Sequence, residues 1–220
     1  MRTFQDLYAI AADRKGGEQE LESLIPPSAT RADLLAIPED RWLMQFARAV
    51  FLAGFSWKVI EAKWPNFETA FHGFDPDACA FLEGDAFDAL ITNPGIVRNG
   101  AKISAVRDNA IFLRDLRAEG GIAQVVADWP ATDYNGLLDI LSKRGSRLGG
   151  TSSQYALRFL GVDGYIFSAD VVARLVAEGV IDKPPTSKTA KRAVQAAFNT
   201  WMQQSDRSLT AISRVLAMSV

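Results

Sequence analysis

The sequence predicts an all-α protein of roughly ten short helices. Apolar residues recur at helical spacing along most of the chain, and no segment shows the apolar–polar alternation of a half-buried strand. Hydrophobic residues make up 48% of the 220 residues, which is enough to build a packed core. No internal repeat or low-complexity tract interrupts this pattern.

A nearly apolar run predicts one long helix over 42–63, which is expected to be buried on most of its faces. Trp64 and Pro65 are expected to end this helix, because the residue before a proline disfavours helical geometry. Asn66 is then expected to cap a short helix that follows.

The remaining helices are predicted from apolar stripes and from the residues that start and stop helices. Pro76 stands in the first turn of one helix, and Gly84 opens another. The last helix is opened by Asp206 or by Ser208. The later helices are expected near 100–118, 122–128, 135–143, 151–160, 168–178, 187–204 and 207–217.

A glycine-rich hairpin at 145–152 leads directly into a helix. Gly149 and Gly150 allow positive φ angles and a close approach of the backbone to a partner. Thr151 or Ser152 is expected to cap the helix, whose free N–H groups favour an anion. The segment therefore fits a main-chain contact with a nucleic-acid phosphate, although these residues alone favour the alternative of a plain glycine-rich turn between two helices.

The basic residues are unevenly spread, although the net charge is −2. The segments 143–158 and 183–192 each carry four Lys or Arg residues and no acid. A nucleic-acid binder that is acidic overall needs its positive charge gathered on one face. The two segments are candidates for such a face, and ordinary solvated helix faces are the alternative.

Composition excludes several classes of site. A single cysteine, Cys79, excludes an internal disulfide, and the single histidine, His72, excludes a multi-histidine metal site. The first residues lack the apolar stretch of a signal peptide, and no apolar run approaches the ~20 residues of a membrane span. We therefore expect a soluble cytoplasmic protein with no membrane partner.

Three blocks together resemble the bacterial 3-methyladenine DNA glycosylase I family, within the helix-hairpin-helix DNA glycosylase superfamily. The first block comprises AGFSW at 53–57 and FHGFDP at 71–76. The second is GIVRNGAKI at 95–103, followed by Asn109-Ala110. The third is the hairpin block KRGSRLGGTSSQY at 143–155. None of these blocks would be specific by itself.

The resemblance implies an all-α fold with two helical lobes around a cleft. It implies one glycosylase-like domain over 1–220, with an N-terminal helical segment at 1–40, a core at 42–178 and C-terminal helices at 186–220. We expect a monomer that binds double-stranded DNA, flips out an alkylated base and hydrolyses its bond to deoxyribose. The expected enzyme is monofunctional, since no lysine stands where bifunctional members of the superfamily carry theirs.

The resemblance also assigns candidate site residues. Trp57 matches the family's base-stacking tryptophan, with core packing as the alternative. Asp170, in the first turn of a helix capped by Ser168, stands where the wider superfamily carries a catalytic aspartate; favourable charge at a helix start is the alternative. The expected DNA-binding residues are Lys143, Arg147, Gly149, Gly150, Thr151 and Ser152.

Two departures from the family pattern limit what the resemblance implies. The family places a base-recognising glutamate eight residues before its tryptophan, and this chain has Ala49 there. The cysteine and histidine ligands of the family's zinc site are absent, so we expect no metal and no cofactor. Ala49 leaves open a glycosylase-like protein that binds DNA or damaged bases without cleaving them, and an unrelated helical interaction protein is the third alternative.

Overall fold

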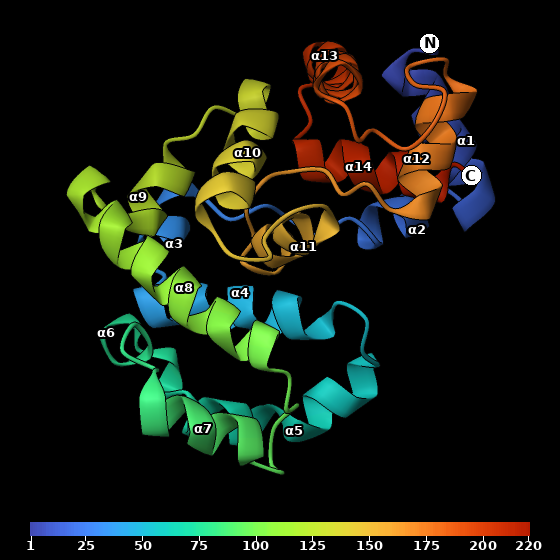
Figure 1. Cartoon of the computed structure of the whole chain (residues 1–220). Helices are drawn as coiled ribbons and strands as arrows, with labels where there is room; N and C mark the ends of the chain where they lie inside the picture. The colour runs from blue at the N-terminus through green and yellow to red at the C-terminus, as the bar shows by residue number, and fades with distance from the viewer. The chain divides into compact units, whose positions relative to one another are not determined.

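The computed structural model describes residues 1–220, which form helices joined by short loops with no β-strand (Figure 1). The predicted all-α class is confirmed. There are 14 α-helices and three short 3-10 segments at His72–Phe74, Arg117–Glu119 and Ala131–Asp133. No helix combines the length and apolar character needed to cross a bilayer.

The chain divides into two compact units, which interleave along the sequence. The first unit comprises Met1–Ala29, Trp129–Leu137 and Gly161–Val220, and the second comprises Thr30–Asp128 and Leu138–Leu160. Because both units draw on distant segments, neither follows the expected boundaries at 40, 42, 178 and 186. The single domain expected from the sequence stays a prediction.

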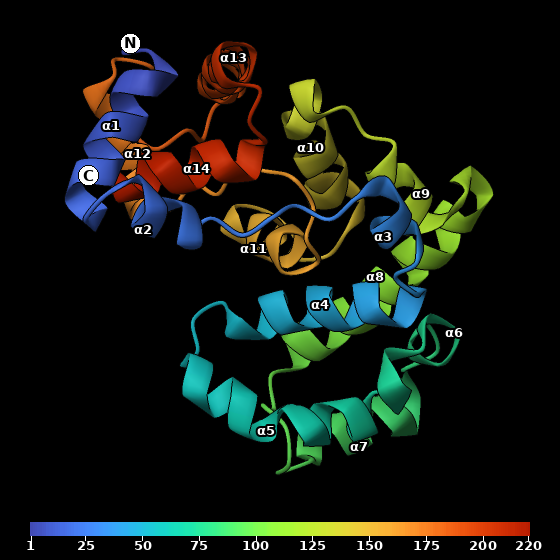
Figure 2. The ribbon, with the colours of Figure 1, turned by 180° about the vertical axis from the view of Figure 1, so that it is seen from behind.

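The first unit is built from helices near the two ends of the chain. In both views α14 lies beside α1 and α12 (Figures 1 and 2). Its largest buried side chains include Tyr165, Phe198 and Trp201. It contains α1 (Phe4–Lys15), α2 (Glu18–Ser23), the start of α10 (Tyr134–Arg144), α12 (Ala169–Ala177), α13 (Lys188–Ser205) and α14 (Leu209–Met218).

The second unit is built around α4, which packs against α8 and α11. Figures 1 and 2 both show α8 running alongside α4. The buried face of α4 carries Trp42, Phe46 and Val50, among other apolar residues. The unit contains α3 (Arg31–Leu35), α4 (Glu39–Leu52), α5 (Trp57–Ala70), α6 (Pro76–Cys79), α7 (Gly84–Thr92), α8 (Gly100–Leu116), α9 (Gly121–Ala127), the end of α10 and α11 (Thr151–Phe159).

The helix expected over 42–63 is two helices. α4 ends at Leu52 and α5 begins at Trp57, with Gly54 at φ 80° between them. The Lys102 ammonium donates hydrogen bonds to the carbonyls of Val50 (2.7 Å), Phe51 (3.2 Å) and Ala53, so the end of α4 has a donor for its free acceptors. Sequence periodicity could not reveal this break, because the donor comes from a distant helix.

Pro65 does not end a helix but lies inside α5, and Asn66 caps nothing there. Proline is unfavourable in a helix interior because it lacks an N–H and crowds the preceding turn. Here the preceding Trp64 stacks on Phe67 (ring centroids 5.3 Å apart) and on Phe74 (5.6 Å). The packing of this aromatic cluster outweighs the local preference.

Several predicted helix starts are confirmed. The Ser168 hydroxyl accepts a hydrogen bond from the Val171 N–H at the start of α12, and Ser208 accepts one from Ala211 at the start of α14. Asp206 is not the cap of α14, because it lies in the left-handed region at the C-terminus of α13.

Candidate base-binding site and nucleic-acid interface

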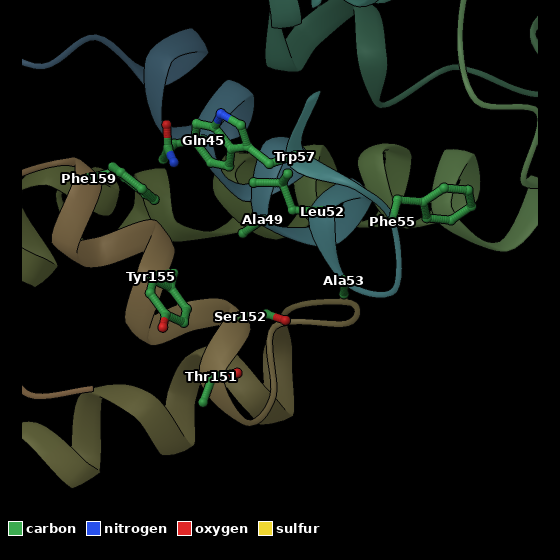
Figure 3. Close-up of a pocket in the computed structure, with 10 residues that line it drawn as sticks. All are labelled: Gln45, Ala49, Leu52, Ala53, Phe55, Trp57, Thr151, Ser152, Tyr155 and Phe159. Atoms are coloured by element: carbon green, nitrogen blue, oxygen red, sulfur yellow. The ribbon is translucent and has the colours of Figure 1, made fainter. Parts of the chain in front are cut away.

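A pocket of about 430 Å³ lies in the second unit between α4, the α4–α5 turn and α11. Ligand pockets typically have volumes of about 300–1,000 Å³, so this one is large enough for a small molecule. No charged side chain lines it (Figure 3). The lining residues are Gln45, Ala49, Leu52, Ala53, Phe55, Trp57, Thr151, Ser152, Tyr155 and Phe159.

Two helical stripes supply half of the lining residues. Residues four apart lie on one face of a helix, so Thr151, Tyr155 and Phe159 line the pocket from successive turns of α11. Gln45 and Ala49 do the same from α4. The pocket therefore follows from helical spacing once α4 and α11 pack together.

Trp57 is the first residue of α5 and faces the pocket (Figure 3). It is 46% exposed, which rules out the core-packing alternative. The Arg48 guanidinium lies 5.2 Å from the centroid of its ring and is ion-paired with Glu61. The Phe159 ring centroid lies 5.9 Å from that of Trp57. The indole is thus held by its neighbours while it stays accessible to a ligand.

Three further exposed aromatic residues, Phe55, Tyr155 and Phe159, border the same pocket. Sequence analysis did not assign them. The spacing of Tyr155 and Phe159 on one helix face was the signal for two of them. Exposed large aromatic residues gathered at one pocket are typical of a binding site rather than of a solvated surface.

The position of the family's glutamate faces this pocket, and Ala49 places only a methyl group there. The nearest polar group on the same face of α4 is Gln45, one turn earlier, which is only 4% exposed. Its amide nitrogen is buried and has no hydrogen-bond partner within the protein. Gln45 was not among the residues predicted from the sequence, although it is the only amide in the apolar stretch 42–47.

The hairpin 145–152 is anchored by a buried asparagine. The Asn109 side chain accepts a hydrogen bond from the Ser146 N–H (2.8 Å) and donates one to the Ser146 carbonyl (3.0 Å). Gly145 sits in contact with neighbouring atoms, since an added Cβ would lie 2.6 Å from the Leu141 carbonyl oxygen. Asn109 thus fixes the path of the chain from α10 into α11.

The predicted caps of α11 are wrong. Gly150, at φ 59°, is the N-cap residue, and no side chain bonds to the helix start. Gly149 does not adopt a positive φ; Arg147 does, at 58°. Thr151 and Ser152 instead line the pocket, so the uncapped start of α11 lies at the pocket wall.

The basic residues at 143–147 differ in how far their side chains are already engaged by protein partners. Lys143 has an exposed side chain whose ammonium lies 3.4 Å from Asp139. The Arg144 guanidinium is paired with Glu119 at 2.7 Å. Arg147 is exposed and donates one hydrogen bond, 3.2 Å long, to the Ala101 carbonyl. Lys143 and Arg147 therefore keep donors available for phosphate oxygens.

Asp170 belongs to the first unit, where it lies exposed in the first turn of α12. The nearby Asp163 has a structural task, because its carboxylate accepts hydrogen bonds from the N–H groups of Leu209 (3.0 Å) and Thr210 (2.8 Å) at the start of α14. No group of three or more His, Cys, Asp or Glu side chains is arranged to hold a metal ion, and the family's zinc ligands are not present.

An aromatic pocket of base size, beside an uncapped helix start and a basic hairpin, is typical of proteins that stack an unpaired base. Residues 41–134 match the model of the methyladenine glycosylase family. This match includes the α4–α5 wall of the pocket and ends before the hairpin 145–152.

Curated relatives point to the same family. Over 58 residues the chain is 38% identical to the DNA-3-methyladenine glycosylase of Haemophilus influenzae, and 36% identical to DNA-3-methyladenine glycosylase 1 of Escherichia coli. Each alignment covers 26% of this chain and only 31% of the relative's length. The chain is thus similar to bacterial 3-methyladenine DNA glycosylase I, as its motifs predicted.

Solved structures give a weaker likeness. A crystal structure of 3-methyladenine DNA glycosylase I aligns with 62% of this chain and 80% of its own, at 24% identity and a TM-score of 0.45. The 3-methyladenine DNA glycosylase I of Staphylococcus aureus aligns with 55% of this chain and 75% of its own, at 23% identity and a TM-score of 0.48.

Proposed function

We propose that this protein is a monofunctional DNA glycosylase of base excision repair that removes alkylated purines such as 3-methyladenine. The observation that carries the proposal is the uncharged aromatic pocket that joins Trp57 to the start of α11. The names of the curated relatives support the same activity. The proposed partner is double-stranded DNA carrying alkylated bases, bound by one copy of the protein.

In the proposed site, different residues bind the DNA phosphate and the flipped base. Backbone amides of Gly149 to Thr151 hold a phosphate, with Lys143 and Arg147 adding positive charge; the Ser152 N–H already donates to the Gly149 carbonyl (3.3 Å). Trp57 stacks on the flipped base. An N3-alkylated adenine in DNA is cationic, and a neutral aromatic face attracts it by stacking and by cation–π interaction.

The reaction breaks the bond between C1′ of deoxyribose and the base nitrogen. The bonding electron pair leaves with the base, positive charge develops on the sugar, and water adds to C1′ and releases a proton. Little acid catalysis is required, since the leaving base is already activated. We assign to the Asp170 carboxylate the stabilisation of the sugar's charge or the uptake of the water's proton.

The first test measures release of free base from duplex DNA treated with a methylating agent. We expect the wild type to release 3-methyladenine, and Trp57→Ala to release it about ten to a hundred times more slowly, because stacking on the base is lost. Phe81→Ala is the matched control, since Phe81 is also an exposed aromatic residue but does not line the pocket. Equal rates for wild type and Trp57→Ala would contradict the role of Trp57.

The role of Asp170 is tested in the same assay. Asp170→Asn is expected to lose base release while it keeps wild-type affinity for the duplex, since the amide cannot stabilise positive charge as a carboxylate does. Asp182→Asn removes another exposed carboxylate of the first unit and serves as the control. Undiminished release by Asp170→Asn would end this assignment.

A second function, binding of DNA or damaged bases without cleavage, is favoured by one observation: no carboxylate lines the pocket, and Ala49 occupies the position of the family's glutamate. That function predicts salt-dependent binding to the duplex with no release of base. A protein that neither binds duplex DNA nor releases base would instead fit the helical interaction protein.

A further inference from the structure

The buried amide of Gln45 is out of place in the wall of an otherwise apolar pocket. The residue is 4% exposed, and its amide nitrogen has no partner within the protein. Most buried polar atoms in folded proteins are hydrogen-bonded, and an unpaired one costs free energy. Something must therefore offset the cost of keeping an amide at this position.

The surroundings of Gln45 indicate a ligand. Gln45 shares its face of α4 with Ala49, and Figure 3 draws it at the same end of the pocket as Trp57 and Phe159. None of these neighbours offers a carboxylate or a backbone group that bonds to the amide. The terminal torsion of glutamine is broad, so the carboxamide plane can turn until its amide nitrogen and its amide oxygen both face the pocket.

We propose that the Gln45 carboxamide recognises the edge of the base that stacks on Trp57. This inference rests on the proposed function and names the group that selects its substrate. A carboxamide is neutral and carries one donor group beside one acceptor. Gln45 therefore selects bases by a matching donor–acceptor pair on their edge, whereas the aromatic wall acts on their ring face and charge.

The matching edge is that of an adenine-type base. Adenine offers its 6-amino group as a donor next to a ring nitrogen that accepts, and glutamine pairs with both at once. Unsubstituted purine has the same ring system and ring acceptors but lacks the amino donor. Free adenine and free purine thus differ only at the 6-amino group, to which Gln45 is proposed to hydrogen-bond.

The experiment titrates the full chain with free adenine, free purine and free 3-methyladenine, followed by calorimetry or ligand-observed NMR. We expect the wild type to bind adenine and 3-methyladenine about ten times more tightly than purine. Gln45→Met keeps the volume and helix preference of the side chain but removes its polar group. We expect this variant to bind adenine and purine equally.

Stability separates a binding role from a structural one. Because Gln45→Met removes an unpaired buried amide, its urea midpoint should equal or exceed that of the wild type. Leu43→Met is the control, since Leu43 is buried on the same helix but does not line the pocket, and the change removes no polar group; it should keep the preference for adenine. A lowered midpoint for Gln45→Met would assign the amide to folding and overturn the proposal.

Two other results would also overturn the proposal. In the first, the wild type binds neither adenine nor 3-methyladenine at millimolar concentration. In the second, Gln45→Met still binds adenine more tightly than purine. Neither result depends on cleavage, because the ligands are free bases. Base release from methylated DNA tests the proposed function separately. Release by a wild type that shows no adenine preference would therefore refute the role of Gln45 alone.

Discussion

Single residues set the shape of the pocket, and Lys102 is the clearest case. It is buried, and burial together with the nearby charge of Arg147 lowers the pKa of its ammonium. The ammonium still donates to three carbonyls at the end of α4 and lies 4.7 Å from the ring centroid of Phe55. Lys102 therefore fixes the turn that leads to Trp57.

Replacing Lys102 with Met should destabilise the protein by about 2–3 kcal/mol, because the carbonyls at the end of α4 lose their donor. Urea unfolding measures this change. Lys58→Met is the control, since Lys58 is exposed on α5 and lies outside the pocket lining. Unfolding midpoints that are equal for the two variants would show that Lys102 does not hold the turn.

Single residues also differ in how far the sequence could predict their place in the pocket. The motif at 53–57 predicted that Trp57 has a functional place, and the structure exposes it at the pocket. No sequence motif marked Gln45, because an isolated glutamine in an apolar helix is usually interpreted as a tolerated polar residue. Its importance appears only when α11 and Trp57 enclose the space beside it.

At the scale of elements, the hairpin 145–152 depends on α8 for its conformation. Asn109→Ala removes both hydrogen bonds to Ser146 and should cost about 2 kcal/mol of stability. It should also weaken duplex binding, since the backbone amides lose their fixed orientation. Urea unfolding and a DNA titration at constant salt measure the two effects.

Asp108→Ala is the matched control, because Asp108 is the neighbouring residue and pairs only with Arg107. It should leave both the unfolding midpoint and the affinity for DNA near those of the wild type. If Asn109→Ala binds the duplex as tightly as Asp108→Ala, the hairpin is not a phosphate contact.

Lys143 and Arg147, the two cations of the hairpin block that keep donors available, should act additively on DNA binding. Lys143→Ala and Arg147→Ala are each expected to reduce the slope of log affinity against log salt by about 1, because each removes one phosphate contact. Lys183→Ala, in the basic segment 183–192, should leave the slope unchanged. Equal slopes for the wild type and all three variants would show that the DNA does not contact Lys143 or Arg147.

At the scale of the whole molecule, the N-terminal segment completes the first unit. Residues of α1, including Phe4, Leu7 and Tyr8, are buried, and the Trp201 indole N–H donates to the Arg2 carbonyl (3.1 Å). The sequence predicted only a helical segment at 1–40. Its structural role follows from contacts that join the two ends of the chain.

Low pH should weaken the contacts between Arg2 and Glu178, which join the two ends of the chain. Burial raises the pKa of Glu178, but hydrogen bonds from the backbone and guanidinium of Arg2 outweigh it, so the pKa lies below its ordinary value of 4.5. A carboxyl with a lowered folded-state pKa adds stability above its unfolded-state pKa, and that stability is lost as the pH falls through the folded-state value.

The comparison of wild type with Glu178→Gln isolates this contribution. The wild type should be more stable by about 2 kcal/mol at neutral pH, and the difference should shrink below about pH 4.5. Urea unfolding at several pH values measures it. A difference that persists unchanged at strongly acidic pH would show that the ionised carboxylate of Glu178 is not the source.

The sequence by itself determined the all-α class and most helix positions, and it marked the blocks at 53–57 and 143–155 as candidate sites. Apolar spacing and cap residues are local, and local patterns can be read along a chain. The break at Ala53–Ser56, the survival of α5 through Pro65 and the true cap of α11 needed the tertiary structure. Each was decided by partners distant in sequence or by the local backbone path that packing imposes.

The pocket itself was also a product of tertiary structure. Its residues come from α4, the following turn and α11, which are separated by about a hundred residues along the chain. The sequence could mark Trp57, Thr151 and Ser152 one at a time, whereas their shared wall, and the unpaired amide of Gln45 in it, exist only because α11 packs on α4. A pattern along the chain encodes which face of a helix is apolar, and packing alone decides which two faces meet.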